Sequence, residues 1–116
     1  MAASASHRDS LIEISSQMVR LFKDTLGRGP RRGRAHFADP QTLVVLLEGT
    51  MTVAERNLAA MGEHKRLRES RMFVQSALED EARAIVERGL RRPTIAFITG
   101  VDPERDVALQ FFTLAG

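Results

Sequence analysis

The sequence lacks cysteine, tryptophan and tyrosine. Without cysteine it has no means of building a disulfide framework, a zinc ribbon, an iron–sulfur site or a thiol nucleophile. Long apolar segments are missing too. The longest run without a charged residue, Val107–Gly116, has ten residues, whereas a membrane-spanning helix needs about 20. The first residues also lack the apolar stretch of a secretory signal. We therefore expect a cytoplasmic protein, whose contact with the inner face of a membrane would be peripheral.

The composition is close to that of an average globular domain. Of the 116 residues, 43% are hydrophobic and 28% are charged, which is enough to build one core without metal or disulfides. We expect a disordered tail over residues 1–8 and a single domain over residues 9–116. The net charge is only +2, although 15 of the 17 basic residues are arginine. The overall charge therefore does not indicate a nucleic-acid-binding protein.

Hydrophobic spacing and turn residues divide the chain into seven elements. Thr52 and Glu55 have the spacing of a capping box at the start of a short helix. Gly89 is placed to end the longest helix. The expected helices cover residues 9–26, 53–61 and 67–88, and the expected strands cover residues 34–38, 42–48, 94–99 and 106–114. The order αββααββ predicts an α+β fold of two layers, in which helices pack on a mainly antiparallel four-stranded sheet.

The same patterns predict which residues share the core. The run 42–48 is continuously apolar, which is typical of a strand that is central in a sheet or covered on both faces. The expected core residues are Leu43, Val45, Leu47, Phe73, Leu78, Ile85, Ile95, Phe97, Leu109 and Phe111.

The most distinctive local feature is the segment Gly27–Arg34, which follows the first helix. It contains four arginines, Arg28, Arg31, Arg32 and Arg34, and three glycines. Guanidinium groups and exposed backbone N–H groups suit phosphate, carboxylate or an acidic protein surface. The segment lacks the Gly-Lys-Ser/Thr ending of a nucleotide-binding loop. It is therefore a candidate anion or partner site, with a solvated connection between helix and strand as the alternative.

A second basic group opens the longest predicted helix. Lys65, Arg66, Arg68 and Arg71 lie at the end of the helix where its dipole disfavours cations. Such a conflict can mark a binding site, so Arg68 and Arg71 are further candidates for contact with an anion or a partner. The alternative is that their aliphatic stems cover apolar surface.

The pattern of residues does not predict catalytic residues, metal ligands or a cofactor. The three histidines form no His-x-His or His-x-x-x-His pair, and no Gly-x-Ser-x-Gly turn is present. Glu48, Thr50, Thr52 and Glu55 gather between a strand and a helix, where helix capping explains Thr52 and Glu55.

Four segments together resemble a known family. They are Gly27-x-Gly29-Pro30, the run Leu47-Glu48-Gly49-Thr50-Met51-Thr52-x-x-Glu55-x-x-Leu58, the triplet Arg71-Met72-Phe73 and the final pair of strands. In these the chain is similar to the small bacterial MpsC-like domain, over about residues 12–114. The family takes its name from a sodium-translocating, membrane-potential-generating system. The resemblance implies a soluble accessory protein or regulator of such a system, and it supplies no catalytic residues.

Three functional hypotheses follow. The favoured one is a non-enzymatic accessory or interaction module, associated with a membrane ion or inorganic-carbon transport system. The alternatives are a protein that binds nucleic acid or another anionic ligand through residues 27–34, and an enzyme. We expect a homodimer, because two hairpins leave sheet edges that need cover. Other candidate partners are an acidic protein, an anionic membrane surface and, less favoured, nucleic acid.

Overall fold

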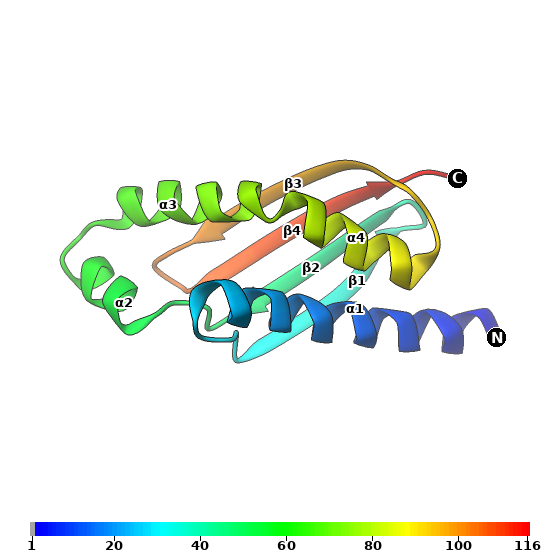
Figure 1. Ribbon diagram of the computed structural model, residues 1–116, viewed down its shortest axis with the longest axis horizontal. Helices are drawn as coiled ribbons and strands as arrows, with labels where there is room; N and C mark the ends of the chain where they lie inside the picture. Colours follow the sequence, from blue (N-terminus) through cyan, green and yellow to red (C-terminus); the bar gives the residue numbers. More distant parts are fainter. Residues whose placement is uncertain (1) are drawn as a thin grey trace.

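A computed structural model describes residues 2–116, with side chains from His7 onward. Four helices and four strands follow one another along the chain (Figure 1). Their bounds are α1 (Ala2–Leu26), β1 (Arg32–Asp39), β2 (Thr42–Glu48), α2 (Val53–Ala60), α3 (His64–Ala77), α4 (Glu79–Leu90), β3 (Thr94–Asp102) and β4 (Val107–Leu114). The prediction of a disordered tail and a domain start at residue 9 stays a prediction, because Met1 and the side chains of residues 2–6 lie outside the described part.

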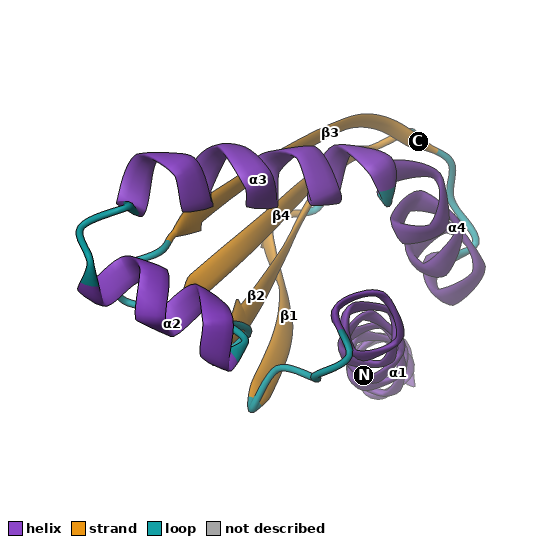
Figure 2. Cartoon of the chain, turned by 60° about the vertical axis from the view of Figure 1, so that its left-hand side comes forward, coloured by secondary structure: helices purple, strands orange, loops and turns teal. Residues whose placement is uncertain are grey.

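The strands form one antiparallel sheet in the order β1-β2-β4-β3. Helices α1, α3 and α4 lie across one face of it, and α2 lies beyond the strand ends (Figures 1 and 2). The predicted two-layer α+β fold is therefore confirmed. The continuously apolar strand β2 is central in the sheet, and helices cover one of its faces.

Local sequence explains where two of the helices begin or end. Gly27 adopts a φ of 79° directly after α1, a left-handed conformation that glycine tolerates, and its N–H donates to the Lys23 carbonyl at 2.9 Å. At the start of α2 the predicted capping box is present. The Glu55 N–H donates to Thr52 Oγ1 at 3.2 Å, and the Thr52 N–H donates to Glu55 Oε1 at 2.9 Å.

The core fills the space between the helices and the inner face of the sheet. Leu43, Val45 and Leu47 of β2 are fully buried there, and Leu78 and Ile85 of the helices are also buried, as predicted. Further core residues come from α1, α4 and β4: Ile14, Met18, Phe22, Ala82, Val86, Ala108, Phe112 and Leu114.

Some of the core prediction is wrong. Phe73 is 77% exposed and Ile95 is 64% exposed, whereas Phe97 is partly buried against the core. Leu109 and Phe111 lie on the outer face of the sheet, because their neighbours Ala108 and Phe112 face the helices.

The longest predicted helix is in fact two helices. The backbone of Leu78 leaves helical geometry, with φ −92° and ψ 3°, and separates α3 from α4. Gly89, the expected end of that helix, lies inside α4, and the helix instead ends at Arg91 with a φ of 55°. Gly89 has another role. A Cβ on it would lie 2.7 Å from Cγ1 of Ile14 in α1, so glycine permits the close approach of the two helices.

Candidate functional site

The face of the sheet opposite the helices carries three rows of side chains that run across all four strands. From β1 to β3 the rows are His36, Val44, Phe111 and Ile98; Arg34, Leu46, Leu109 and Gly100; and Arg32, Glu48, Val107 and Asp102. We call the apolar members of these rows the open sheet face: Val44, Leu46, Ile98, Val107, Leu109 and Phe111. All six are at least partly exposed, and Ile98 is 60% exposed.

The open sheet face is a group of neighbouring apolar side chains on three strands. The three rows together span four strands about 4.8 Å apart and five residues at about 3.4 Å each, roughly 300 Å², and the open sheet face holds six of their twelve positions. Contiguous apolar patches of a few hundred Å² on a monomer often mark an interaction site. In Figure 1 the helices lie in front of the sheet, so this face points away from the viewer.

Basic side chains border the open sheet face along strand β1. We call Arg32, Arg34 and His36 the basic edge. Arg34 Nη2 forms an ion pair with Glu48 Oε1 on the neighbouring strand at 2.8 Å. Arg32 and His36 are exposed. The apolar surface therefore ends in positive charge on the β1 side.

A buried ion pair lies at one end of the helical layer. Arg71 of α3 is 2% exposed, and its guanidinium holds Glu55 of α2 with two hydrogen bonds, from Nε at 2.6 Å and from Nη2 at 2.8 Å. Arg71 also donates to both oxygens of Thr50, from Nη1 to Oγ1 at 3.0 Å and from Nη2 to the carbonyl at 2.6 Å. This arginine joins α2, α3 and the segment after β2.

Asp106 extends the same network to the turn between β3 and β4. Its Oδ1 accepts hydrogen bonds from the Thr50 N–H at 2.7 Å and from Thr50 Oγ1 at 3.0 Å, and its carboxylate also accepts from the Met51 N–H at 3.1 Å. Asp106 adopts a φ of 55°, a left-handed conformation that is uncommon outside glycine. The run Gly49–Glu55 is thus fixed by side chains from two distant parts of the chain.

The network also sets the ionisation of Glu55. Partial burial raises the pKa of this carboxyl, but hydrogen bonds from Arg71 and Thr52 and the charge of Arg71 outweigh burial and hold the pKa below its ordinary value of 4.5. Glu55 is therefore ionised at neutral pH, as an ion-pair partner of a buried arginine requires.

The predicted site residues fall into three environments. In the loop after α1, Arg28 is partly buried and Arg31 is exposed, while Arg32 and Arg34 belong to β1. Arg68 is exposed on α3, with Nε 3.5 Å from the Val101 carbonyl. Arg71 is buried, with its guanidinium already occupied by Glu55 and Thr50. The structure places Arg32 and Arg34 beside the open sheet face, and it buries Arg71 beneath α3 while Arg68, one turn earlier, stays exposed.

Helix α2 is a surface feature that the sequence analysis did not single out. None of its residues is buried, and Val53 is 63% and Leu58 is 41% exposed. Met61, directly after the helix, is 74% exposed. The sequence analysis predicted this helix from its capping box alone and assigned none of its residues to the core or to the surface.

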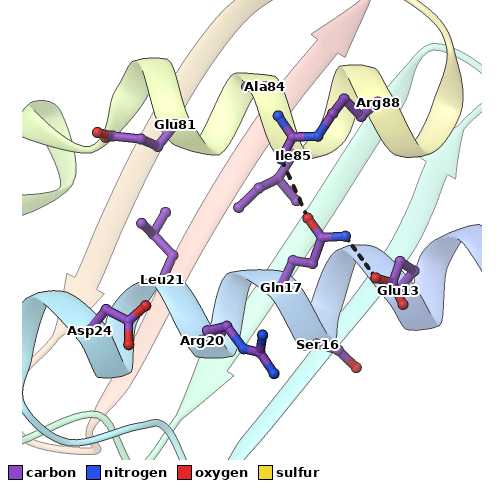
Figure 3. Close-up of a pocket in the computed structure, with 10 residues that line it drawn as sticks. All are labelled: Glu13, Ser16, Gln17, Arg20, Leu21, Asp24, Glu81, Ala84, Ile85 and Arg88. Carbon is purple, nitrogen blue, oxygen red and sulfur yellow. Dashed lines mark hydrogen bonds between the residues drawn. The ribbon is translucent and has the colours of Figure 1, made fainter.

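A groove of about 540 Å³ runs between α1 and α4 (Figure 3). Leu21, Ala84 and Ile85 provide apolar lining. Charged residues of both signs surround them: Glu13, Arg20, Asp24, Glu81 and Arg88. Gln17 donates to Glu13 of the same helix at 2.7 Å, and its Oε1 accepts from Arg88 Nη2 of α4 at 3.5 Å, which joins the two helices. The mixture of charges gives the groove no preference for an anion or a cation.

Two kinds of feature are absent from the described residues 2–116. No helix there has the length and apolar character to cross a membrane. No group of three or more histidine, aspartate or glutamate side chains there is arranged to hold a metal ion.

Comparison with known proteins gives one match. No curated protein and no solved structure matches the chain. The family model described as "Na+-translocating membrane potential-generating system (MpsC)" matches residues 9–116, nearly the whole chain. That range includes both the run fixed by Arg71 and Asp106 and the strands of the open sheet face. The chain belongs to the MpsC family.

Proposed function

We propose that this chain is a non-enzymatic accessory module that docks onto a protein component of a membrane-potential-generating system. We infer the membrane system from the family, whose description names Na⁺ translocation and a membrane potential. The chain's own surface supplies the mode of action, which is binding through the open sheet face.

The observation that carries this proposal is the open sheet face itself. The inner side chains of the same strands, such as Leu43, Val45 and Phe112, are fully buried under helices. The side chains of the open sheet face are all at least partly exposed, and the helices of residues 2–116 leave this side of the sheet uncovered. Covering such a surface removes apolar area from water, which is the main favourable contribution to most protein associations.

The basic edge indicates the chemistry of the partner. Arg32 and His36 are exposed beside the apolar rows, and Arg34 shares its charge with Glu48. A complementary partner presents apolar side chains at its centre and carboxylates on the side that meets β1. Charge of this kind fixes the orientation of docking and accelerates association.

The alternative function is binding of nucleic acid or another anionic ligand through residues 27–34. It is favoured by Arg28, Arg31 and Arg32, none of which forms an ion pair with another described residue. Such binding depends on released counterions, so its affinity falls steeply with salt. Docking through the open sheet face is apolar at its centre and depends much less on salt.

The test compares two lysine variants in binding to membrane vesicles from the source organism. Leu109→Lys places a charge at the centre of the open sheet face, and Phe73→Lys places the same charge on an exposed site of α3. We expect binding at physiological salt to fall at least tenfold for Leu109→Lys and to stay unchanged for Phe73→Lys. Protease treatment of the vesicles should lower binding of the wild-type chain to the level of Leu109→Lys, because the partner is a protein.

Two results would contradict the proposal. Equal binding by both variants, each confirmed as folded by circular dichroism, would mean that the open sheet face is not the docking surface. A wild-type mass of twice 12.9 kDa by light scattering, reduced to 12.9 kDa by Leu109→Lys, would assign that face to a second copy of this chain and confirm the predicted homodimer instead.

A further inference from the structure

Helix α2 exposes apolar side chains at one end of an elongated molecule of 49 × 23 × 22 Å. It lies beyond the strand ends, at the end opposite the two termini (Figure 1). Val53, Leu58 and Met61 are 63%, 41% and 74% exposed there. Surface helices of globular proteins normally turn their apolar side chains toward the core. Helix α2 does not turn its apolar side chains toward the core, although a capping box and an ion pair with Arg71 fix its position.

Polar contacts hold α2 in this position. The capping box closes its first turn, and Glu55 binds the buried guanidinium of Arg71. Glu55 is therefore on the side of α2 that meets α3, and most contacts of α2 are with that helix. The apolar side chains are left exposed because an ion pair, not apolar burial, anchors the helix.

Cations lie on α2 and on the segments next to it, all exposed except Arg28, which is partly buried. The loop after α1 lies beside the start of α2, because Arg31 packs its stem over Gly49 and its N–H donates to the Glu48 carbonyl at 2.8 Å. The first turns of α3 add further basic residues. The cations at this end are Arg28, Arg31 and Arg32 of the loop and the start of β1, Arg56 of α2, Lys65, Arg66 and Arg68 of α3, and Arg105 of the turn after β3. Two ion pairs partly offset this charge, between Glu63 and Arg66 at 3.3 Å and between Asp102 and Arg105 at 3.5 Å.

From this combination we propose that the α2 end, meaning α2 with its surrounding cations, binds the surface of an anionic phospholipid bilayer. Aliphatic and thioether side chains enter the boundary between headgroups and acyl chains, while arginine and lysine remain at the phosphate level. The exposed apolar residues here are not aromatic, so they offer no surface for stacking nucleic-acid bases. This inference goes beyond the proposed function, because it uses another surface and a lipid ligand.

The experiment measures flotation of the purified wild-type chain with vesicles. Vesicles of phosphatidylcholine with about 30% phosphatidylglycerol are compared with vesicles of phosphatidylcholine alone. We expect binding to the anionic vesicles only, weakened but not abolished as salt rises, because apolar insertion is insensitive to screening. Equal binding to both kinds of vesicle, or binding to neither, would overturn the inference.

Two variants and their matched controls separate the two contributions. Arg28→Gln/Arg31→Gln/Arg32→Gln should lower the partition coefficient on the order of 100-fold at low salt. Leu58→Ser/Met61→Ser should lower it at least tenfold at any salt concentration. The controls make the same types of change at the opposite end of the molecule: Arg8→Gln/Arg88→Gln/Arg91→Gln and Ile95→Ser, all at exposed sites.

The controls should bind vesicles as the wild type does. If the serine variant keeps full binding, the attraction is purely electrostatic and the inference fails, with an acidic protein, nucleic acid or free phosphate as the remaining ligands of the cations. Leu109→Lys should bind lipid vesicles normally. Failure of lipid binding and failure of docking through the open sheet face are therefore separate results.

Discussion

At the scale of single residues, Arg71 explains why the run Gly49–Glu55 is constrained. A guanidinium that is 2% exposed needs partners for its donors, and Glu55 and Thr50 accept four hydrogen bonds from it. Thr50 is held in place by Asp106, so Arg71 depends on two other parts of the chain, the run Gly49–Glu55 and Asp106. The sequence analysis identified Thr52 and Glu55 as a cap. It did not predict the ion pair, because nothing local relates Glu55 to a residue 16 positions away.

Replacing Arg71 should therefore be costly. We expect Arg71→Met to lower the free energy of unfolding by about 3–5 kcal/mol, because Glu55 and Thr50 would lose their partner in a region screened from water. The measurement is urea denaturation followed by circular dichroism. The double variant Glu55→Gln/Arg71→Met should be less destabilised than the sum of the single changes, since the two residues act as a pair. Additive effects would mean that the ion pair does not form.

The same pair predicts how stability depends on pH. The pKa of Glu55 is lowered in the folded protein, so the unfolded chain binds a proton more readily than the folded one. The contribution is complete above the unfolded pKa, near 4.5, and is lost as pH falls through the folded pKa. Hydrogen bonds also lower the pKa of Glu87 and Asp102, which act in the same direction.

Denaturation curves between about pH 5 and pH 2 should thus show a smaller loss of stability for Glu55→Gln than for the wild type. A variant of an exposed glutamate, Glu69→Gln, is the control and should follow the wild type. If Glu55→Gln were as sensitive to acid as the wild type, the ion pair would not stabilise the folded state.

At the scale of elements, the sequence predicted the type and order of nearly every helix and strand. Its errors concern the face that each element buries. Along β4, Leu109 and Phe111 were expected in the core, yet Gln110 is fully buried and Leu109 and Phe111 are the outward residues. The buried face of α3 was also predicted wrongly, because the helix turns Arg71 and Gln75 inward and exposes Phe73. When an element buries polar residues, as β4 and α3 do, hydrophobic periodicity predicts the wrong face of that element to be buried.

The break between α3 and α4 was also not predicted from the sequence. No proline or glycine lies near Leu78, and hydrogen bonds continue across it, from its N–H to the Val74 carbonyl and from the Ala82 N–H to its own carbonyl. The acidic residues Glu79, Asp80 and Glu81 form the first turn of α4, where the helix dipole favours negative charge. That run was a signal for a helix start, but it also fitted a salt-bridged face within one long helix.

Gly89 provides the test at this scale. In an exposed helix Gly→Ala normally stabilises, by up to about 1 kcal/mol. Here we expect Gly89→Ala to lower the melting temperature, with a loss of about 1–3 kcal/mol, because the added methyl group would overlap Ile14 and push α1 away from α4. Gly89→Ala should cost less in an Ile14→Ala background, which lacks both the Cγ1 and the Cδ1 that the methyl group would overlap. A more stable Gly89→Ala variant would show that α1 and α4 are not in close contact.

At the scale of the whole molecule, the order of elements predicted the two-layer α+β fold, but the sequence predicted the binding surfaces only in part. The arginines of the loop after α1 were predicted, and they lie between the open sheet face and the α2 end. Neither surface was predicted as such. Both depend on which side of a sheet or helix stays uncovered, and only the packing of all four helices decides that.

The two surfaces suggest how the chain is arranged at a membrane. The α2 end would rest on anionic lipid, and the open sheet face, on the side of the molecule, would meet the partner protein. Together they would restrict the chain to one orientation, and weak contacts at two sites would combine into stable attachment. In this arrangement the arginines of the loop after α1 contribute to both contacts, since they border both surfaces.

The most direct test of the docking account uses the absence of cysteine, because a single introduced thiol is then a unique label. The rates of maleimide labelling are measured for Leu109→Cys on the open sheet face and for Phe73→Cys on exposed α3, free and bound to membrane vesicles from the source organism. The account predicts that binding slows labelling of Leu109→Cys at least tenfold and leaves Phe73→Cys unchanged. Equal labelling of Leu109→Cys in the free and bound chain would contradict it.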